Sequence, residues 1–311
     1  MPQADRPEAL AAVRMSAPSP AGDALAAAPC KSLSAQARSG RQAASMRAQL
    51  GLIVVFPIKA LDGVAVEEAA ITAGGILEHD RVYAIVDAQG KAVNGKRNPR
   101  VHRLGCRFDP KFREVAFAER GSGSEARFAL AEPGPLTRWL SDFFGAPVSF
   151  QRESKHGFPD DHEAFGPTVA SRASLAAVAG WFPNLNLESA RRRFRTNLEL
   201  DGPELPAFWE DRLYGAAGEL RPFRIGEVAV RGHNPCQRCV VPTRDPDTAE
   251  ATAGFQIQFA ERRRDCLPPW ADRSRFNHFY RFAVNTSILP SEAGKRLRMG
   301  DGVELIPPSK A

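Results

Sequence analysis

From position 52 onward, hydrophobic and β-branched residues occur in short runs separated by Gly, Pro, Asn or Asp. Runs of this length, bounded by turn-forming residues, predict β-strands. The predicted strands cover residues 52–56, 82–86, 114–117, 127–130, 148–150, 197–200, 228–231 and 303–306. Residues 86–93 (VDAQGKAV) place turn-forming residues between two strand-like flanks, so this segment predicts a hairpin.

Two segments instead show the spacing of three and four residues between apolar positions that indicates an amphipathic helix. The first covers residues 135–144, where the apolar positions are Leu136, Trp139, Leu140 and Phe143. The second covers residues 171–179, with Ser171 as a suitable N-cap. Strands outnumber helices, and we therefore expect a mainly β protein with some α structure, composed of a β-rich domain at 50–160 and a barrel-like domain at 161–308.

The beginning of the chain has a different composition. Residues 1–49 contain no Phe, Tyr or Trp and are rich in Ala, Ser, Pro and Arg. Such a segment has too little apolar surface to fold, so we expect a disordered extension over residues 1–48. Its Arg and Ser content is similar to that of a transit peptide, although Asp5, Glu8 and Asp23 argue against one, and translation from a later methionine is an alternative.

The overall composition is that of a globular protein with a modest basic excess. The 42 Lys and Arg residues against 36 Asp and Glu give a net charge of +6, which favours an anionic ligand such as a phosphate-bearing cofactor but not nucleic acid as a partner. No apolar run approaches the roughly 18 residues that span a bilayer, so no membrane span is expected. The five cysteines are unevenly spaced, unlike a disulfide framework, and we expect a reducing, cytoplasmic location.

The segment NPCQRCVVPTRDPDTAE, residues 234–250, contains two cysteines three positions apart, Cys236 and Cys239. A structural zinc site would need a second pair of ligands at short spacing, whereas Cys266 and His278 are isolated. A thioredoxin-like pair would open a helix, which the two following prolines oppose. The third interpretation is one metal thiolate with a bystander cysteine, and a cation at Arg238 favours the thiolate form of Cys239.

Within this segment, CQRCVVPTRDPDT resembles the molybdenum-binding loop of the MOSC family (molybdenum cofactor sulfurase C-terminal domain), whose mitochondrial members are the amidoxime-reducing components. The family pattern is Cys-x-Arg-Cys followed by Thr-x-Asp-Pro-Asp-Thr. Further matches occur in the family's order: FPIKALDGV (56–64), HDRVYAIVD (79–87), RFRTNLELDG (193–202) and RMGDGVEL (298–305). Five ordered matches between about residues 50 and 308 imply an N-terminal MOSC β-rich domain followed by a MOSC β-barrel domain.

The resemblance implies that Cys239 is the molybdenum ligand and the catalytic residue. It also implies that the molybdenum cofactor, Mo-molybdopterin, is bound by residues at matching positions: Lys59, Arg81, Arg195, Asn197, Gln237 and Arg238, with Ser171, Ser174 and Asn285 as further contributors. Cationic side chains suit the cofactor phosphate, and Asn suits the polar pterin edge. The chain departs from the mitochondrial pattern at Ala60, where serine is usual, at Thr196, where proline is usual, and at Gln237.

By the same resemblance, the expected function is reduction of N-hydroxylated compounds: amidoximes, hydroxylamines and N-hydroxylated bases. The sequence has no iron–sulfur cysteine run, so electrons are expected from a separate protein, either ferredoxin-like or cytochrome b5-like, with its reductase. The alternative is a protein that binds or carries the molybdenum cofactor, related to the C-terminal domain of the cofactor sulfurases.

The sequence leaves the roles of two groups of charged residues open. Asp245 and Asp247 are either a catalytic carboxylate pair or residues that shape their loop, and the Asp-Pro-Asp-Thr sequence favours the second role. The arginine runs 191–193 and 262–264 are expected to be solvated faces, which would be available to an acidic electron donor.

Overall fold

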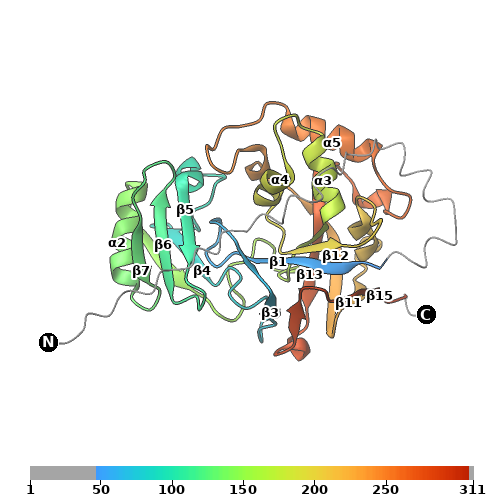
Figure 1. Ribbon diagram of the computed structural model, residues 1–311, viewed down its shortest axis with the longest axis horizontal. Coiled ribbons are helices and arrows are strands. Elements are labelled where there is room, and N and C mark those ends of the chain that lie inside the picture. The colour runs from blue at the N-terminus through green and yellow to red at the C-terminus, as the bar shows by residue number, and fades with distance from the viewer. Residues whose placement is uncertain (1–46, 308–311) are drawn as a thin grey trace.

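The computed structural model describes residues 47–307, so the expected disordered extension lies outside the described residues except for its last two positions. Figure 1 shows two lobes: a smaller β-rich lobe with one helix on the left, and a larger lobe on the right, in which the helices lie above a curved sheet. The mainly β architecture with some α structure is confirmed. In the part of the chain that is described, no helix has the length and apolar character needed to cross a membrane.

The larger lobe is built on an eight-stranded sheet in the order β15-β11-β12-β13-β9-β10-β1-β2. Neighbouring strands are antiparallel except for β9 and β10, which are parallel. The strands are β1 (Gln49–Val55), β2 (Val64–Val66), β9 (Val169–Ser171), β10 (Leu198–Asp201), β11 (Arg221–Ile225), β12 (Val228–Gln237), β13 (Arg281–Ile288) and β15 (Val303–Leu305). Two short pieces, β3 (Glu68–Ala70) and β14 (Arg296–Arg298), form a separate antiparallel pair.

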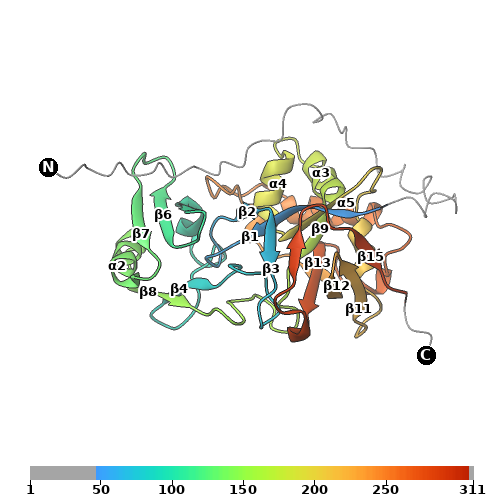
Figure 2. The same ribbon diagram turned by 60° about the horizontal axis from the view of Figure 1, so that its bottom comes forward.

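The sheet closes into a barrel because the start of β1 meets the chain just before β15. Gln49 bridges to Gly302, the Leu50 N–H donates to the Asp301 carbonyl (2.8 Å), and the Val303 N–H donates to the Ala48 carbonyl (2.8 Å). Figure 2 shows β1 passing across the top of this strand array. Its inward side chains, among them Leu50, Ile53 and Val55, are buried in the barrel core. The predicted barrel-like character of the second half is thus present, with two strands, β1 and β2, supplied from the first half.

The smaller lobe has its own core. It contains β4 (Tyr83–Asp87) paired with β8 (Val148–Arg152), the meander β5 (Leu104–Phe108), β6 (Glu114–Glu119) and β7 (Ala126–Ala129), and helix α2 (Pro133–Phe144). The predicted helix at 135–144 is confirmed, and its buried face consists of Leu136, Leu140 and Phe144. In the predicted hairpin, the turn after Asp87 forms, and the second flank bridges from Ala92 to Val86 on the edge of β4 that β8 does not occupy. The Asp87 N–H donates to the Lys91 carbonyl (2.9 Å) and the Val93 N–H donates to the Ile85 carbonyl (2.7 Å).

Three helices cover the barrel: α3 (Arg172–Gly180), α4 (Leu187–Phe194) and α5 (Phe255–Asp265). The predicted α3 is confirmed together with its N-cap, where the Ser171 hydroxyl accepts from the Ser174 N–H. Phe194, Phe255 and Phe259 form an aromatic layer between these helices and the sheet, with ring centroids 5.6–6.3 Å apart.

The prediction that both arginine runs are solvated is wrong for the third residue of the first run and the middle residue of the second. Arg193 is 5% exposed and Arg263 is 1% exposed. Arg263 forms an ion pair with the buried Asp211, and its guanidinium carbon lies 3.9 Å from the centroid of the Phe208 ring. A paired and stacked guanidinium can occupy a core position that its charge alone would exclude.

Candidate functional site

The loop that carries Cys239 begins where β12 ends. The β12–β13 register becomes irregular between Pro235 and Gln237, and the last contact to β13 is the Arg238 N–H donating to the Tyr280 carbonyl (3.1 Å). The chain then enters a single 3₁₀ turn, η5 (Val241–Thr243), and the Val241 N–H donates to the Cys239 Sγ (3.5 Å). Cys239 is therefore half-buried in a loop and does not precede an α-helix, unlike the cysteines of a thioredoxin-type pair.

The two cysteines of the motif have different surroundings. Both are free thiols, but the hydrogen bond of the Cys236 Sγ among the described residues goes to the neighbouring Gln237 carbonyl (3.7 Å), and the Gln237 side chain is exposed. Within residues 47–307, no three His, Cys, Asp or Glu side chains are grouped as metal ligands. A structural zinc site made of protein ligands has no ligand set in this part of the chain.

Arg238 links the cysteine loop to two other elements. Its Nε donates to the Phe282 carbonyl in β13 (2.9 Å), and its Nη1 donates to the Phe194 carbonyl at the end of α4 (3.0 Å). Its Nη2 is buried and has no hydrogen-bond partner among the described residues. One donor of this guanidinium therefore lacks a hydrogen bond in the described structure, although the group lies 5.7 and 5.8 Å from the centroids of the Phe194 and Phe282 rings.

Tyr280 is a second buried donor near the cysteine, and sequence reasoning missed it. Its side chain is 7% exposed, and no partner in the described part of the chain reaches its hydroxyl. Burial raises the pKa of Tyr280 well above its ordinary value, and the charges of Arg238 and Cys239 both act on the hydroxyl. No spacing or motif in the sequence marks this tyrosine, since its neighbours FNHFYRF are simply aromatic.

Lys59 follows β1 and lies against the segment that leads into the barrel domain. Its Nζ donates to the carbonyls of Phe158 (3.0 Å) and Pro159 (2.9 Å) and forms an ion pair with Asp160 (2.8 Å). The charge of Lys59 and its hydrogen bond, together with the charge of Arg81, hold the pKa of Asp160 below its ordinary value. Lys59 and Arg81 therefore share one electrostatic neighbourhood.

Arg81 and Arg195 both lie close to the Phe56 ring. Both have a positive φ (53° and 51°), and their guanidinium carbons are 5.9 Å and 4.1 Å from the centroid of Phe56. Arg81 pairs with Asp80 (2.9 Å), whereas Arg195 donates to the Leu61 carbonyl. Burial, together with the like charge of Arg81, lowers the pKa of Arg195 to about 10. The structure thus brings together the three cations that the sequence singled out.

Asn197 is fully buried, and its amide is saturated by protein partners. Its Nδ2 donates to the Val54 carbonyl (3.0 Å) and to Asp80 Oδ1 (3.0 Å), while its Oδ1 accepts from the N–H and hydroxyl of Thr168. Asp80 Oδ1 also accepts from the Phe56 N–H (2.8 Å). Asn197 therefore positions the strand and loop that present Arg81 and Phe56, and it has no polar atom left for a cofactor.

The two serines suggested as contributors also have structural partners. Ser171 and Ser174 are 0% exposed and lie 2.7 Å apart at the start of α3. The Ser174 hydroxyl donates to Glu210 (2.8 Å) and accepts from the Phe208 N–H. The remaining suggested residue, Asn285, donates to the side chain of Asn234 on the adjacent strand (3.2 Å). These contacts give no support to cofactor binding by the two serines.

The two aspartates after the cysteine shape and anchor its loop. Asp245 Oδ1 accepts from the N–H groups of Asp247 and Thr248, and Asp247 forms two hydrogen bonds with Arg192 (both 2.6 Å) and an ion pair with Arg120 (3.4 Å). Burial opposes ionisation of Asp245, but the backbone N–H groups and Arg193 hold its pKa below the ordinary value. The hydrogen bonds from Arg192 lower the pKa of Asp247. Both carboxylates are ionised at neutral pH, which fits the structural role.

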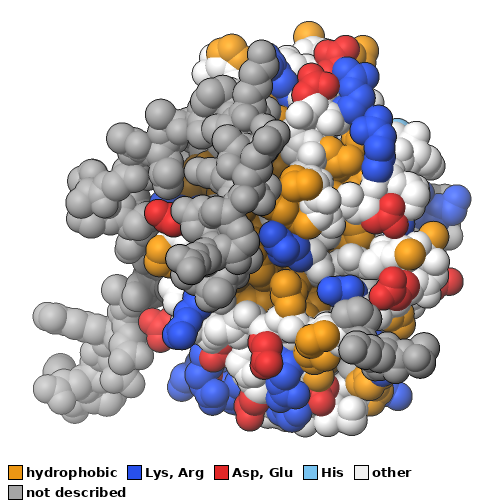
Figure 3. Space-filling model, turned by 90° about the vertical axis from the view of Figure 1, so that its right-hand side faces the viewer, with side chains coloured by type: hydrophobic (Ala, Val, Ile, Leu, Met, Phe, Trp, Pro, Cys, Tyr) orange, Lys and Arg blue, Asp and Glu red, His pale blue; other side chains and the backbone are white. Residues whose placement is uncertain are grey.

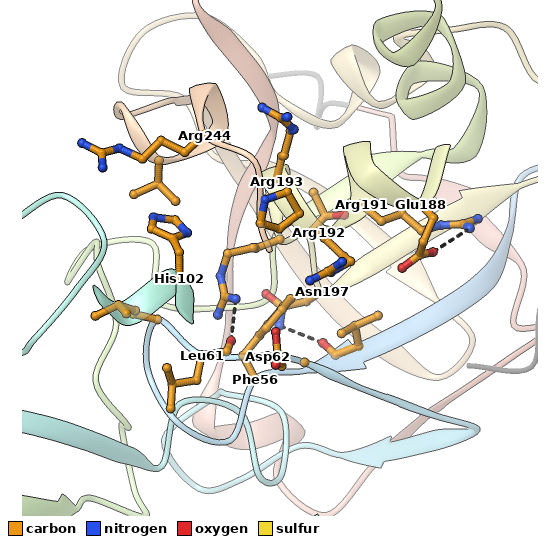
Figure 4. Close-up of a pocket in the computed structure, with 18 of the residues that line it drawn as sticks. Phe56, Leu61, Asp62, His102, Glu188, Arg191, Arg192, Arg193, Asn197 and Arg244 are labelled. Carbon is orange, nitrogen blue, oxygen red and sulfur yellow. Dashed lines mark hydrogen bonds and ion pairs between the residues drawn. The ribbon is translucent and has the colours of Figure 1, made fainter. Parts of the chain in front are cut away.

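A pocket opens between the two lobes, next to the cysteine loop (Figure 4). Apolar side chains from β1, the loop after it and the smaller lobe form much of its wall: Leu52, Val54, Phe56, Leu61, Val101 and Leu104. Its charged lining contains six arginines and three carboxylates: Arg120, Arg191, Arg192, Arg193, Arg195 and Arg244, with Asp62, Glu188 and Glu199. Val241, whose N–H contacts the Cys239 Sγ, also lines the pocket, so the pocket adjoins the cysteine.

Two family models match the chain over most of the described residues. The MOSC N-terminal beta barrel domain matches residues 47–133, and the MOSC domain matches residues 160–304. The chain belongs to the MOSC family. The second match includes the whole of the Cys239 loop, and the first includes Lys59 and Arg81. In this MOSC protein the strands do not follow the boundary between the two matches. Strands β1 and β2 lie within the region matched by the N-terminal domain model but belong to the barrel sheet.

Curated relatives with similar sequences fall into two groups. The chain is 24% identical over 260 residues to human mitochondrial amidoxime-reducing component 1, and the aligned region covers 69% of this chain and 71% of the relative. It is 22% identical over 284 residues to human mitochondrial amidoxime reducing component 2, covering 80% and 81%. It is also 23% identical over 259 residues to the molybdenum cofactor sulfurase of Drosophila grimshawi, covering 70% of this chain but 31% of the sulfurase.

The residues around Cys239 suit the anionic molybdenum cofactor that the family implies. A half-buried free thiol lies beside two buried donors without partners, Arg238 Nη2 and the Tyr280 hydroxyl, in the described structure. The cations at Lys59, Arg81 and Arg195 suit the phosphate end of such a group. Unpartnered buried donors are costly in a folded protein, and an anionic ligand would satisfy them.

Proposed function

We propose that this MOSC protein is a molybdenum-cofactor-dependent reductase of N-hydroxylated compounds: amidoximes, hydroxylamines and N-hydroxylated bases. The observation that carries the proposal is the Cys239 site, where one half-buried free thiol lies near unsatisfied buried donors and accepts from the N–H of Val241, which lines the pocket between the lobes. The names of the two human relatives, both amidoxime-reducing components, support the substrate class. The reaction consumes two electrons and two protons and converts an N–OH group into N–H with release of water.

In this proposal the molybdenum cofactor supplies the two-electron redox chemistry, and the chain supplies its binding site. Cys239 is the protein ligand to molybdenum. Arg238 and Tyr280 donate hydrogen bonds beside it, and Lys59, Arg81 and Arg195 hold the phosphate. The aspartates Asp245 and Asp247 keep the ligand loop in place through Arg193, Arg192 and Arg120. Asn197 and Asp80 hold the segments that carry Arg81 and Arg195 in position through their buried hydrogen bonds.

Electrons are proposed to come from a separate ferredoxin-like or cytochrome b5-like protein with its reductase. The described residues contain no group of cysteines or histidines that would hold an iron–sulfur cluster. The isolated chain should therefore turn over with a chemical donor such as reduced methyl viologen, and NADH alone should give no turnover until a carrier and its reductase are added.

A second candidate function is binding or delivery of the molybdenum cofactor without turnover. The match to a molybdenum cofactor sulfurase, which the chain covers over 31% of its length, is the observation that favours it. Both candidates need the same cofactor site, and they differ only in whether a bound substrate is reduced.

The test is to express residues 1–311 in a host that makes the molybdenum cofactor, to measure molybdenum and zinc in the purified protein, and to assay benzamidoxime with reduced methyl viologen. Reductase function predicts about one molybdenum per chain and formation of benzamidine. Molybdenum without any turnover of amidoximes, hydroxylamines or N-hydroxylated bases would support the carrier. Zinc in place of molybdenum would contradict both.

A further inference from the structure

The pocket beside the Cys239 loop has an excess of positive charge at one end. At the opposite end, charges are balanced: Arg191 makes two hydrogen bonds with Glu199 (both 2.7 Å) and an ion pair with Glu188 (3.6 Å). Along the lobe boundary, Arg120 makes two hydrogen bonds with Asp62 (2.6 and 2.7 Å). Figure 4 shows Arg191 and Glu188 on one side of the pocket and Arg244 with His102 on the other.

Arg244 is the least compensated of these arginines. Its Nε is buried and has no hydrogen-bond partner among the described residues, and the nearby aspartates pair with Arg192 and Arg193 instead. Arg244 occupies the variable position of the Thr-x-Asp-Pro-Asp-Thr motif, five residues after Cys239. Arg244 therefore lines the pocket at a short chain distance from the proposed metal ligand.

His102 faces Arg244 from the smaller lobe. Its Nε2 is buried next to Gly95 and has no hydrogen-bond partner in the described part of the chain. Burial lowers the pKa of His102, and the charges of Arg244, Arg195 and Arg120 outweigh the opposing charge of Asp245, so the imidazole is neutral at neutral pH. A neutral imidazole can donate one hydrogen bond to an anion without adding to the mutual repulsion of the arginines.

The wall next to this charged end is apolar, with Leu61, Val101, Leu104 and Val241 as its lining residues. An apolar wall with a few convergent polar groups is typical of a small-molecule site. On the face of the protein drawn in Figure 3, Lys and Arg are mixed with Asp and Glu around hydrophobic side chains in the part that is described. The pocket combines features that suit an apolar body bearing one anionic group.

Resting on the proposed reductase function, we propose that His102 and Arg244 form a subsite for the anionic group of the substrate. The preferred substrates are then N-hydroxylated compounds whose apolar body carries a carboxylate or phosphate. Arg244 provides a charge-assisted fork to the anion, and His102 provides a neutral hydrogen bond from the other lobe. The subsite is assembled only where the smaller lobe and the Cys239 loop meet.

The test compares congeners of benzamidoxime that differ only in the para substituent: carboxylate, phosphonate and neutral carboxamide. The wild-type protein should prefer one or both anionic congeners in kcat/KM. In Arg244→Ala the preference over the carboxamide should fall about tenfold, the size expected for loss of one charge-assisted hydrogen bond. His102→Ala should reduce the same ratio by a smaller factor.

Arg103→Ala is the matched control, because Arg103 adjoins His102 in sequence but pairs with Glu119 on the exposed surface. It removes the same charge and should leave the preference ratio unchanged. An equal change for all congeners in Arg244→Ala would overturn the proposal, since Arg244 would then only shape its loop. Loss of molybdenum from Arg244→Ala or His102→Ala would also overturn it, by assigning these residues to the cofactor.

Equilibrium binding separates failure of this proposal from failure of the reductase function. The probes are 4-carbamoylbenzoate and the neutral terephthalamide, neither of which can be reduced at nitrogen. If no congener is reduced but 4-carbamoylbenzoate binds more tightly in an Arg244-dependent manner, the reductase function fails and the anion subsite stands. If the two probes bind wild-type protein and Arg244→Ala alike, the subsite does not exist.

Discussion

Cys236 and Cys239 are three positions apart in the sequence, but their thiols have different hydrogen-bond partners and neighbours. The Cys239 thiol accepts from a backbone N–H and lies near Arg238 and Tyr280, whereas the Cys236 thiol only contacts the next carbonyl. We expect Cys239→Ser to lose molybdenum and viologen-driven turnover, because a serine hydroxyl is a poor ligand for a metal that favours thiolates. Cys236→Ser should keep most of both, as measured by metal analysis and benzamidoxime reduction.

This pair of variants is its own matched control, since each removes one sulfur from the same loop. Loss of metal from Cys236→Ser with retention in Cys239→Ser would reverse the assignment of the ligand. Equal loss of zinc from both would indicate a structural cysteine pair.

Tyr280→Phe removes a buried hydroxyl that has no partner in the described structure. The cofactor-free variant should be as stable as the wild type or more so, by up to about 1 kcal/mol, because an unsatisfied buried polar group is costly. This corresponds to a rise of about 2–4 °C at most in the melting temperature. The cofactor-loaded variant should lose molybdenum faster on dialysis. A clear fall in the melting temperature of the cofactor-free variant would mean that the hydroxyl is satisfied without a ligand.

At the residue scale, sequence patterns could predict the ligand loop but not its surroundings. The five ordered motifs led to Cys239, Lys59, Arg81 and Arg195, and the structure brings the three cations together. The same motifs suggested Asn197, whose saturated hydrogen bonds depend on Val54, Asp80 and Thr168 far away in the chain. Tyr280 and His102 could not be predicted, because only the tertiary fold brings them to the site.

At the scale of single elements, the 3₁₀ turn η4 (Trp209–Leu213) contains a buried carboxyl group, that of Glu210, whose pKa is raised. Glu210 is 1% exposed, and burial together with the charge of Asp211 raises its pKa to about 7. Between about pH 4.5 and 7 the folded state keeps a proton that the unfolded state releases. Stability should therefore fall as pH rises through this range, by roughly 3 kcal/mol at most.

Glu210→Gln should remove this effect, because the amide carbonyl can still accept from Ser174 while the side chain no longer ionises. Urea unfolding at pH 5 and pH 8 should show the variant gaining stability over the wild type at the higher pH. The exposed Glu219→Gln is the matched control and should follow the wild type at both values. A variant no more stable than the wild type at pH 8 would show that Glu210 is ionised in the native protein.

Sequence patterns predicted the elements well where one face is apolar and poorly where arginines are buried. The strands now seen as β1, β4, β6, β7, β8, β10, β12 and β15 and the helices α2 and α3 were predicted. Helices α4 and α5 were not predicted, because their runs of three arginines were interpreted as solvated faces. Arg193 and Arg263 are instead buried by contacts to Asp245 and Asp211, which lie about 50 residues away in the chain.

At the scale of the whole molecule, the predicted domain boundary at residue 160 lies between the regions matched by the two family models. It does not divide the strands in the same way, because strands from both sides of residue 160 form the barrel sheet. β1 pairs with β10, and its first residues bond to the segment before β15. The smaller lobe is thus inserted between the strand that closes the barrel and the strands that form the rest of it. Its placement sets the lobe boundary at which the pocket and the Cys239 loop meet.

Barrel closure by β1 also constrains the order of folding. Gln49 and Asp201 are partners in the sheet although they are about 150 positions apart, so their pairing must wait for synthesis of most of the chain. Until then, the edge of β1 that pairs with β10 is open and can pair with other chains. A fragment that lacks β1 leaves the matching edge of β10 open. Residues 160–307 alone should aggregate, and a separate peptide of residues 47–71 should restore a soluble barrel. Gel filtration with and without the peptide would measure this complementation; a monodisperse fragment without it would show that the barrel tolerates an open seam.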